Sequence, residues 1–290
     1  MVNPVPSTAS ISLRPYTPAD STAVLALADG DRVPGQPSVT PGMLIEALEG
    51  RSPIDGGWWA ELDRPETYVA GDAWGGVTGA ISWALRPHDD TGVILWLHCQ
   101  ENVETADALI GQAVLRFGRR PIQAFQFATA LTRGLEALPR RHRSVTHDAL
   151  ERAGFIGRCQ WRYLMIDLPA PGLPRAEGVR ITPELGDDRA CRLQVRMGER
   201  PVAEAVIGLP QERTGVLWWI AVMPDTRRRG LGSALLGSAL DVLRSHGATA
   251  VFLYVEADSP IGGDSDRTAA TAMYRSAGFI EVDRLYSYNR

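Results

Sequence analysis

A basic, glycine-containing turn is the strongest chemical signal in this sequence. An apolar segment ends at Val222, Pro224 follows, and residues 227–233 then read Arg-Arg-Arg-Gly-Leu-Gly-Ser before a helical pattern that runs to about His246. Glycines let the backbone approach a ligand, and the first amides of a helix lack intrahelical partners. With the helix dipole and three arginines, the pattern predicts a cradle for a phosphate or pyrophosphate.

Other phosphate-binding motifs fail on spacing. A dinucleotide-binding fingerprint needs a third glycine where Leu235 stands, and a P-loop needs Gly-Lys followed by Ser or Thr, which this turn lacks. An exposed helix start with solvated arginines is the remaining alternative.

The order Arg-x-x-Gly-x-Gly, after a strand that ends Val-x-Pro, resembles the acetyl-CoA motif of the GNAT superfamily of N-acyltransferases. The resemblance covers about residues 178–290 by motif and about residues 11–168 by internal repeat. It implies acetyl-CoA as co-substrate and transfer of an acetyl or short acyl group to a primary amine of a small molecule or peptide. In this family the strand backbone also binds the pantetheine arm. The cofactor residues so implied are Ile220, Ala221, Val222, Arg227, Arg228, Arg229, Gly230, Leu231, Gly232 and Ser233.

A second segment, residues 270–279, resembles the family pattern Ala-x-x-x-Tyr-x-x-x-Gly-Phe. The resemblance implies that Tyr274 lies near the cofactor sulfur and protonates the leaving thiolate; simple packing is the alternative. Family members usually carry Asn seven residues before this tyrosine, whereas this sequence has Arg267, and residues 259–266 have the composition of an inserted polar loop. The segment Leu-Tyr-Val-Glu at 253–256 also resembles mycothiol synthases, a tandem group within the family.

Acyl transfer to an amine also needs a base, because a free lysine-type amine has a pKa of about 10.4. Glu256, at the end of the predicted strand 251–255, is the first candidate, and Glu204 on a hairpin strand is the second. Both have the alternative interpretation of solvated surface carboxylates. Without a base, the chain would be an acyl-CoA-binding sensor or pseudoenzyme.

The elements that must position these residues occur twice in the chain. Four pairs of segments match in the same order: 91–97 with 214–220, 114–116 with 242–244, 125–127 with 252–254, and 153–156 with 277–280. With a proline-rich linker at 169–177, this predicts domains at 1–168 and 178–290. The fold class is α/β (α+β): tandem GNAT-like domains, each a mixed, mostly antiparallel twisted sheet flanked by helices. The second copy is predicted to lack the helices that residues 18–28 and 41–48 form in the first.

The first copy lacks the cradle. With the strands aligned from Thr91 and Thr214, Glu104, Asp107 and Leu109 lie opposite the arginine and the two glycines of the cradle motif. The equivalent of Tyr274, four residues before Gly154, is Leu150. Carboxylates would repel a pyrophosphate, so the first copy is predicted not to use acyl-CoA in the ordinary way. It would serve as scaffold and as a wall for the substrate.

Composition limits the partners. A net charge of −4 and a pI near 5.8 give no support for nucleic acid, and no segment is long and apolar enough to cross a membrane. Residues 1–12 have no leader pattern, and the three cysteines have neither disulfide-framework nor zinc spacing. We expect a cytoplasmic monomer or homodimer without a bound metal. The histidines are predicted as surface or capping residues, and the basic run 140–143 as a solvated loop. The pairs Trp58-Trp59 and Trp218-Trp219 are predicted to pack, with a substrate-facing position as the alternative for Trp58-Trp59, which follow a glycine-rich loop.

Overall fold

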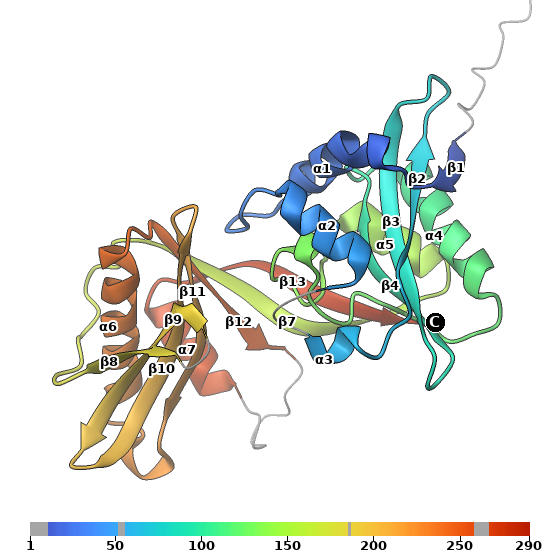
Figure 1. The fold of residues 1–290 in the computed structure, drawn as a ribbon. Helices are drawn as coiled ribbons and strands as arrows, with labels where there is room; N and C mark the ends of the chain where they lie inside the picture. Colours follow the sequence, from blue (N-terminus) through green and yellow to red (C-terminus); the bar gives the residue numbers. More distant parts are fainter. Residues whose placement is uncertain (1–10, 52–55, 185–186, 258–266) are drawn as a thin grey trace, which may run out of the picture. The chain divides into compact units, whose positions relative to one another are not determined.

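The computed structural model describes residues 11–51, 56–184, 187–257 and 267–290, and it divides the chain into two compact units (Figure 1). Unit 1 contains Met1–Gln160 and Arg284–Arg290, and unit 2 contains Trp161–Asp283. The division falls within two strands, β7 (Ile156–Asp167) and β13 (Ile280–Asn289). The sequence predicted one break over 169–177 and a second domain to residue 290, whereas here the last residues belong to unit 1. As a boundary between two sequence copies, 169–177 stays a prediction.

Unit 1 is a mixed sheet flanked by helices. Its elements are β1 (Ser12–Pro15), η1 (Pro18–Asp20), α1 (Ser21–Gly30), α2 (Pro41–Glu49), α3 (Gly56–Trp59), β2 (Glu66–Gly71), β3 (Val77–Arg86), β4 (Thr91–His98), α4 (Val103–Phe117), β5 (Ile122–Ala124), η2 (Ala130–Thr132), β6 (Leu138–Pro139) and α5 (Ser144–Arg152). The strand order is β1-β2-β3-β4-β5-β13, with β6 also paired to β13. The β4–β5 pair is parallel, and the other pairs of this unit given by the described residues are antiparallel.

Unit 2 repeats the second half of that plan. Its elements are the end of β7, β8 (Arg180–Glu184), β9 (Asp187–Met197), β10 (Arg200–Gln211), β11 (Thr214–Val222), η3 (Pro224–Thr226), α6 (Leu231–Ser245), β12 (Ala250–Glu256), α7 (Thr268–Ser276) and the start of β13. The strand order is β7-β12-β11-β10-β9-β8, and β11–β12 is its parallel pair. Because only residues 185–186 separate β8 from β9, no counterpart of α1 and α2 fits between them.

The predicted architecture of a mixed, mostly antiparallel sheet flanked by helices is confirmed in both units. In each, a strand, a helix and a parallel strand follow one another, and a glycine in the first strand admits the helix. A Cβ built on Gly92 would lie 2.5 Å from the Phe117 ring of α4, and one built on Gly215 would lie 2.8 Å from Leu243 of α6. The sheet and helix therefore approach closely at the same place in both units.

Helix α6 follows from its sequence. Leu235, Leu236, Leu240 and Leu243 recur at three- and four-residue spacing, and all four are buried in the core of unit 2. Burying a leucine side chain stabilises the fold by about 1.5–3 kcal/mol. No helix among the described residues has the length and apolar character needed to span a membrane. The cysteines Cys99, Cys159 and Cys191 are free thiols.

Candidate functional site

The parallel strands β11 and β12 of unit 2 separate after a short stretch of pairing. They pair at Thr214–Ala250, Gly215–Val251 and Val216–Phe252, but β11 continues to Val222 and β12 to Glu256. Among the described residues, the separation leaves one edge of β11 without a neighbouring strand over residues 217–222. This is the place at which the sequence predicted the cofactor to enter.

The part of β11 with the unpaired edge carries the three predicted pantetheine residues, Ile220, Ala221 and Val222. All three are half-buried. Their other edge pairs with β10, in the register Ala205–Ile220 and Ala203–Val222. In the described part of the chain, one side-chain hydrogen bond reaches this stretch: Arg227 Nε donates to the Val222 carbonyl at 3.0 Å.

The prediction that Trp218 and Trp219 pack is wrong. Trp218 is 49% exposed and Trp219 is 45% exposed. A register shift between Val206 and Ile207 of β10 leaves Trp218 without a partner in the strand pairing, so the two indoles do not follow the regular alternation of the strand. In unit 1, Trp59 is buried against Phe127, while Trp58 stacks on the same ring and is half exposed.

The cradle lies between β11 and α6. Arg228 and Gly230 both have positive φ, +60° and +78°, so the chain turns sharply before Leu231 begins the helix. The first helical hydrogen bond runs from the Ala234 amide to the Gly230 carbonyl at 3.0 Å, and no side chain in the described residues caps this end. The amides of residues 231–233 are therefore available to an external acceptor.

The space over the cradle is open. A Cβ built on Gly230 would meet no atom within 4 Å, and Arg227, Arg228 and Arg229 are all exposed. The nearby Asp225 carboxylate is already paired with Arg200 at 2.9 Å. Uncapped amides, a positive-φ glycine and three cations fit the pyrophosphate of a coenzyme A molecule.

Helix α7 adjoins this cradle. A Cβ on Gly232 would lie 3.1 Å from Met273 Sδ and 3.6 Å from Val222 Cγ2, so the helix start, the strand end and α7 meet at one point. Tyr274, next in α7, is 7% exposed and packs edge-to-face on Phe279. Burial raises the pKa of its hydroxyl to about 12. The phenol therefore keeps its proton at neutral pH.

The two candidate bases lie in different surroundings. Glu256, at the end of β12, is exposed and pairs with Arg267 at 3.6 Å, so the residue that replaces the family's Asn contacts this carboxylate. Glu204, in β10, accepts a hydrogen bond from Gln194 at 2.9 Å and pairs with Arg192 at 3.2 Å. The predicted polar loop at 259–266 lies outside the described residues.

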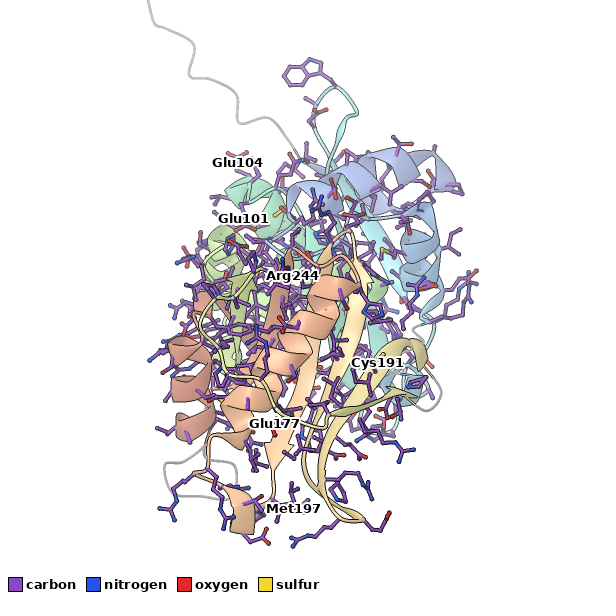
Figure 2. All side chains as sticks on the ribbon, turned by 90° about the vertical axis from the view of Figure 1, so that its left-hand side faces the viewer. Glu101, Glu104, Glu177, Cys191, Met197 and Arg244 are labelled. Carbon is purple, nitrogen blue, oxygen red and sulfur yellow. The ribbon has the colours of Figure 1, made fainter. Side chains whose placement is uncertain are left out.

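The corresponding connection in unit 1 is shorter, which corrects the ungapped alignment. Residues 99–102 join β4 to α4, whereas residues 223–230 join β11 to α6. The helix start that matches Gly230 is therefore Asn102, not Asp107, and the Asn102 side chain accepts from the Thr105 amide at 2.9 Å. Glu101 and Glu104 lie on this connection and on the first turn of α4 (Figure 2). This helix start is capped by its own Asn102 and carries a carboxylate, unlike the uncapped start of α6. That unit 1 does not use acyl-CoA stays a prediction.

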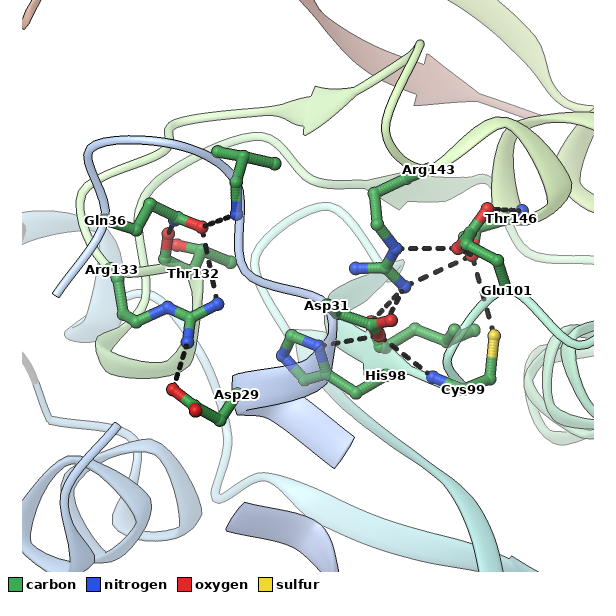
Figure 3. A network of polar contacts seen from close by, with 12 residues as sticks. Asp29, Asp31, Gln36, His98, Cys99, Glu101, Thr132, Arg133, Arg143 and Thr146 are labelled. Atoms are coloured by element: carbon green, nitrogen blue, oxygen red, sulfur yellow. Dashed lines mark hydrogen bonds and ion pairs between the residues drawn. The ribbon is translucent and has the colours of Figure 1, made fainter. Parts of the chain in front are cut away.

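Side chains also occupy the edge of β4. Asp31 accepts from the Cys99 amide at 3.1 Å, and Arg143 Nη2 donates to the Leu97 carbonyl at 2.9 Å (Figure 3). The glycines and bulges of the two strands align Leu97 with Ile220 and Cys99 with Val222. Two side chains thus take the backbone groups of unit 1 that correspond to the predicted pantetheine contacts.

The histidines were predicted as surface or capping residues and the run 140–143 as a solvated loop, and that prediction is wrong for three of these residues. His98, Arg143 and His147 are all less than 5% exposed. Arg143 pairs with Asp31 at 3.1 Å and with Glu101 at 2.7 Å, and His147 Nδ1 lies 2.8 Å from the Tyr288 hydroxyl. His147 also lies within 4.8 Å of the Asp148 and Glu151 carboxylates, a spacing that the sequence analysis did not single out.

Burial and neighbouring charges shift the pKa values of Asp31 and His98 in this network. Burial lowers the pKa of His98, although Asp31 beside it acts in the opposite direction, so His98 is neutral. For Asp31, burial opposes ionisation, but Arg143, His98 and the Cys99 amide together lower its pKa. The result is an ionised carboxylate held by a buried guanidinium and a neutral imidazole.

Comparison with known proteins gives a family for part of the chain. Residues 160–279 match the model of the acetyltransferase (GNAT) family. Mycothiol acetyltransferase of Renibacterium salmoninarum is 34% identical over 76 residues, which is 26% of this chain and 20% of the relative. That of Clavibacter sepedonicus is 44% identical over 71 residues, or 24% and 21%. The [ribosomal protein bS18]-alanine N-acetyltransferase of Salmonella typhimurium is 34% identical over 95 residues, or 33% and 58%. The match thus spans about a fifth of the first mycothiol relatives.

Solved structures match the whole chain in fold. A GCN5-related N-acetyltransferase from Sphaerobacter thermophilus superposes with a TM-score of 0.58 at 14% identity, covering 97% of this chain and 95% of that one. A tandem GNAT protein from the clavulanic acid biosynthesis pathway gives 0.60 at 13% identity, covering 97% and 98%. The predicted tandem fold is confirmed by this likeness.

Proposed function

We propose that unit 2 transfers an acetyl or short acyl group from acyl-CoA to a primary amine, in keeping with the match of residues 160–279 to the acetyltransferase (GNAT) family model. The observation that carries the proposal is the open edge of β11 ending in an uncapped, arginine-rich helix start. A strand edge and a helix start in series match the two polar parts of the cofactor, the pantetheine amides and the pyrophosphate.

In the proposed mechanism the cradle from Arg227 to Ser233 holds the pyrophosphate, and the backbone of 220–222 holds the pantetheine arm. Acyl-CoA, when bound, supplies an activated thioester. Glu256 accepts the proton that the acceptor amine must lose before its nitrogen can attack the acyl carbon. As the carbon–sulfur bond breaks, the hydroxyl of Tyr274, which is protonated at neutral pH, donates a hydrogen bond and then its proton to the departing sulfur.

The acceptor class is the finer part of the proposal. The named relatives comprise mycothiol acetyltransferases and an acetyltransferase of a ribosomal protein alanine, so both a small molecule and a peptide amine are represented. The half-exposed indoles of Trp218 and Trp219 on β11 provide an apolar surface beside the thioester end of the proposed site. We expect an acceptor with an apolar or sugar-like face next to its amine.

The test is turnover of the full chain with acetyl-CoA and a panel of small-molecule and peptide amines, followed by release of free thiol. Amine-dependent thiol release supports the transferase. Tight acetyl-CoA binding without thiol release across the panel would favour the sensor or pseudoenzyme.

Two matched variants decide the base. Glu256→Gln should lower kcat/KM by about 10²- to 10⁴-fold, the usual contribution of a general base. Glu204→Gln, on the neighbouring hairpin strand, should retain most activity. The reverse ranking would move the role to Glu204.

A further inference from the structure

One face of β12 in unit 2 leads from two aromatic rings to Glu256. The odd-numbered residues of 251–255 are buried in the core with α6. Because side chains alternate along a strand, Phe252, Tyr254 and Glu256 lie together on the opposite face of the sheet. The rings of Phe252 and Tyr254 lie 5.6 Å apart, centroid to centroid. The proposed base therefore lies at the end of an apolar row.

Strand β11 extends the same apolar surface. Its Val216 pairs with Phe252, and paired residues point to the same face of a sheet. A Cβ built on Gly208 of β10 would lie 2.5 Å from Val216 Cγ1 and 2.9 Å from Trp218 Cζ2, so both side chains lie on one side of this glycine. The half-exposed indole of Trp218 thus shares its face of the sheet with Phe252 and Glu256.

Arg267 brings a positive charge beside Glu256. It precedes α7, and its Nη2 lies 3.6 Å from Glu256 Oε2, within reach for an ion pair but too far for a hydrogen bond. The two side chains are 47% and 44% exposed, so a ligand can reach both charges. Burial raises the pKa of the Tyr274 hydroxyl, and Arg267 acts in the opposite direction, so its charge lies within electrostatic reach of that hydroxyl.

Two opposite charges at ion-pair spacing restrict the acceptor. An acceptor with an ammonium alone would pair with Glu256 but would offer nothing to Arg267. An acceptor whose amine and carboxylate are attached to the same carbon carries its own two charges close together, so that the ammonium meets Glu256 while the carboxylate meets Arg267. Contacts between a guanidinium and a carboxylate are among the stronger polar contacts in proteins. The N-terminus of a peptide has no carboxylate at this position.

We propose that the acceptor is a free α-amino acid with an apolar side chain, an inference that rests on the function proposed for unit 2. Arg267 binds its carboxylate, and the face of Trp218 and Phe252 contacts its side chain. The ammonium gives one proton to Glu256, and the neutral nitrogen bonds to the acyl carbon as the carbon–sulfur bond breaks. The sulfur leaves as a thiol with the proton of Tyr274, which the second proton lost by the nitrogen replaces. The products are an N-acyl amino acid and free coenzyme A.

Thiol release by the full chain with acetyl-CoA tests this proposal on matched acceptors. L-phenylalanine is compared with phenethylamine and L-leucine with isopentylamine, because each amine lacks only the carboxylate. We expect kcat/KM to be at least about tenfold higher for the amino acid in one or both pairs, since the contact with Arg267 is lost in the amines. Turnover of the amines without this preference would overturn the proposal and leave the transferase intact. Thiol release with no acceptor would remove the transferase as well.

Variants of Arg267 assign the preference to this residue. In Arg267→Met the ratio of kcat/KM between amino acid and amine should fall at least about tenfold, mainly through a higher KM for the amino acid. Arg267→Lys keeps the charge and should restore part of the ratio. Arg275→Met, at an exposed arginine in the last turn of α7, is the matched control and should leave the ratio unchanged. If Arg267→Met lowers the rates for amino acid and amine equally, Arg267 does not bind the carboxylate and the proposal is wrong.

Discussion

The ends of β4 and β11 share one arrangement of elements, but they differ in whether side chains bond the strand edge and cap the helix start. Both strands lead through a turn into a helix and a parallel strand. At β4 the edge is bonded by Asp31 and Arg143 and the helix start is capped by Asn102, whereas at β11 the edge is open and the helix start is uncapped. The comparison teaches that side chains in one unit can make hydrogen bonds at backbone groups that are left open at the equivalent place in the other unit. Four predictions test this comparison, from the largest expected effect to the smallest.

The largest effect should come from Gly230→Asp. The side chain would meet no atom, but it would place a carboxylate where the pyrophosphate is proposed to lie, on a residue with φ of +78°. Since hydrogen bonds to charged groups are worth about 1.5–3 kcal/mol each, losing two or more should weaken coenzyme A binding by at least about 10²-fold in calorimetry. Gly247→Asp is the matched control, because Gly247 also has positive φ and open space, at the other end of α6. Unchanged affinity in the Gly230 variant would place the cradle elsewhere.

Tyr274→Phe should come next. The variant keeps the ring and its packing on Phe279 but removes the proposed proton donor. We expect kcat to fall by about 10²- to 10⁴-fold at neutral pH, with acetyl-CoA affinity little changed. The loss should shrink as pH rises past about 8.5, the pKa expected for the thiol by analogy with Cys, because the thiolate then leaves without a proton. Tyr163→Phe, at a second buried tyrosine of unit 2, serves as control. Full activity of Tyr274→Phe at every pH would leave this residue only a packing role.

Opening the edge of β4 should cost stability without creating a second cofactor site. Arg143→Met leaves Asp31 buried without its guanidinium and should lower the free energy of unfolding of unit 1 by about 3–5 kcal/mol, measured by urea unfolding. Arg152→Met, which breaks an exposed pair with Asp107 in the same unit, should cost about 0–1 kcal/mol. Coenzyme A should still bind once per chain in both variants. Two equivalent sites in the Arg143 variant would show that the side chains on the edge of β4 alone prevent coenzyme A from binding to unit 1.

The smallest effect is a pH dependence of unit 1. Burial lowers the pKa of His98, so the folded state binds fewer protons than the unfolded state, in which a histidine has a pKa of about 6.5. Its contribution is therefore complete above that pH and is lost as pH falls through the folded pKa. His147 has a lowered pKa for the same reason, so each is replaced by Gln in turn, and the unfolding midpoint is followed from neutral to mildly acidic pH. If His98→Gln leaves the pH dependence of the unfolding midpoint unchanged, His98 does not contribute to that dependence.

The sequence predicted best what is encoded over a few residues. The strand end at Val222, the turn at Gly230 and the helix start at Leu231 follow from local spacing, and Tyr274 and Leu150 occupy equivalent positions in α7 and α5. The buried network of unit 1 was missed because its partners are distant in the chain, with Asp31 and His98 lying 67 positions apart. The equivalence of Asp107 to Gly230 failed because an ungapped alignment cannot register a shortened connection.

The end of the last strand belongs to unit 1, and this has a consequence for synthesis on the ribosome. The last strand, β13, pairs Tyr288 with Ala124 of β5, and Tyr288 is fully buried in the core of unit 1. The N-terminal unit is thus translated first yet lacks part of its core until residues 284–290 have emerged. At about 5–20 residues per second, translation of 161–283 imposes a wait of roughly 6 to 25 s. During that time the nascent unit 1 should be more sensitive to protease than the released chain, a difference that stalled chains ending before residue 280 would reveal.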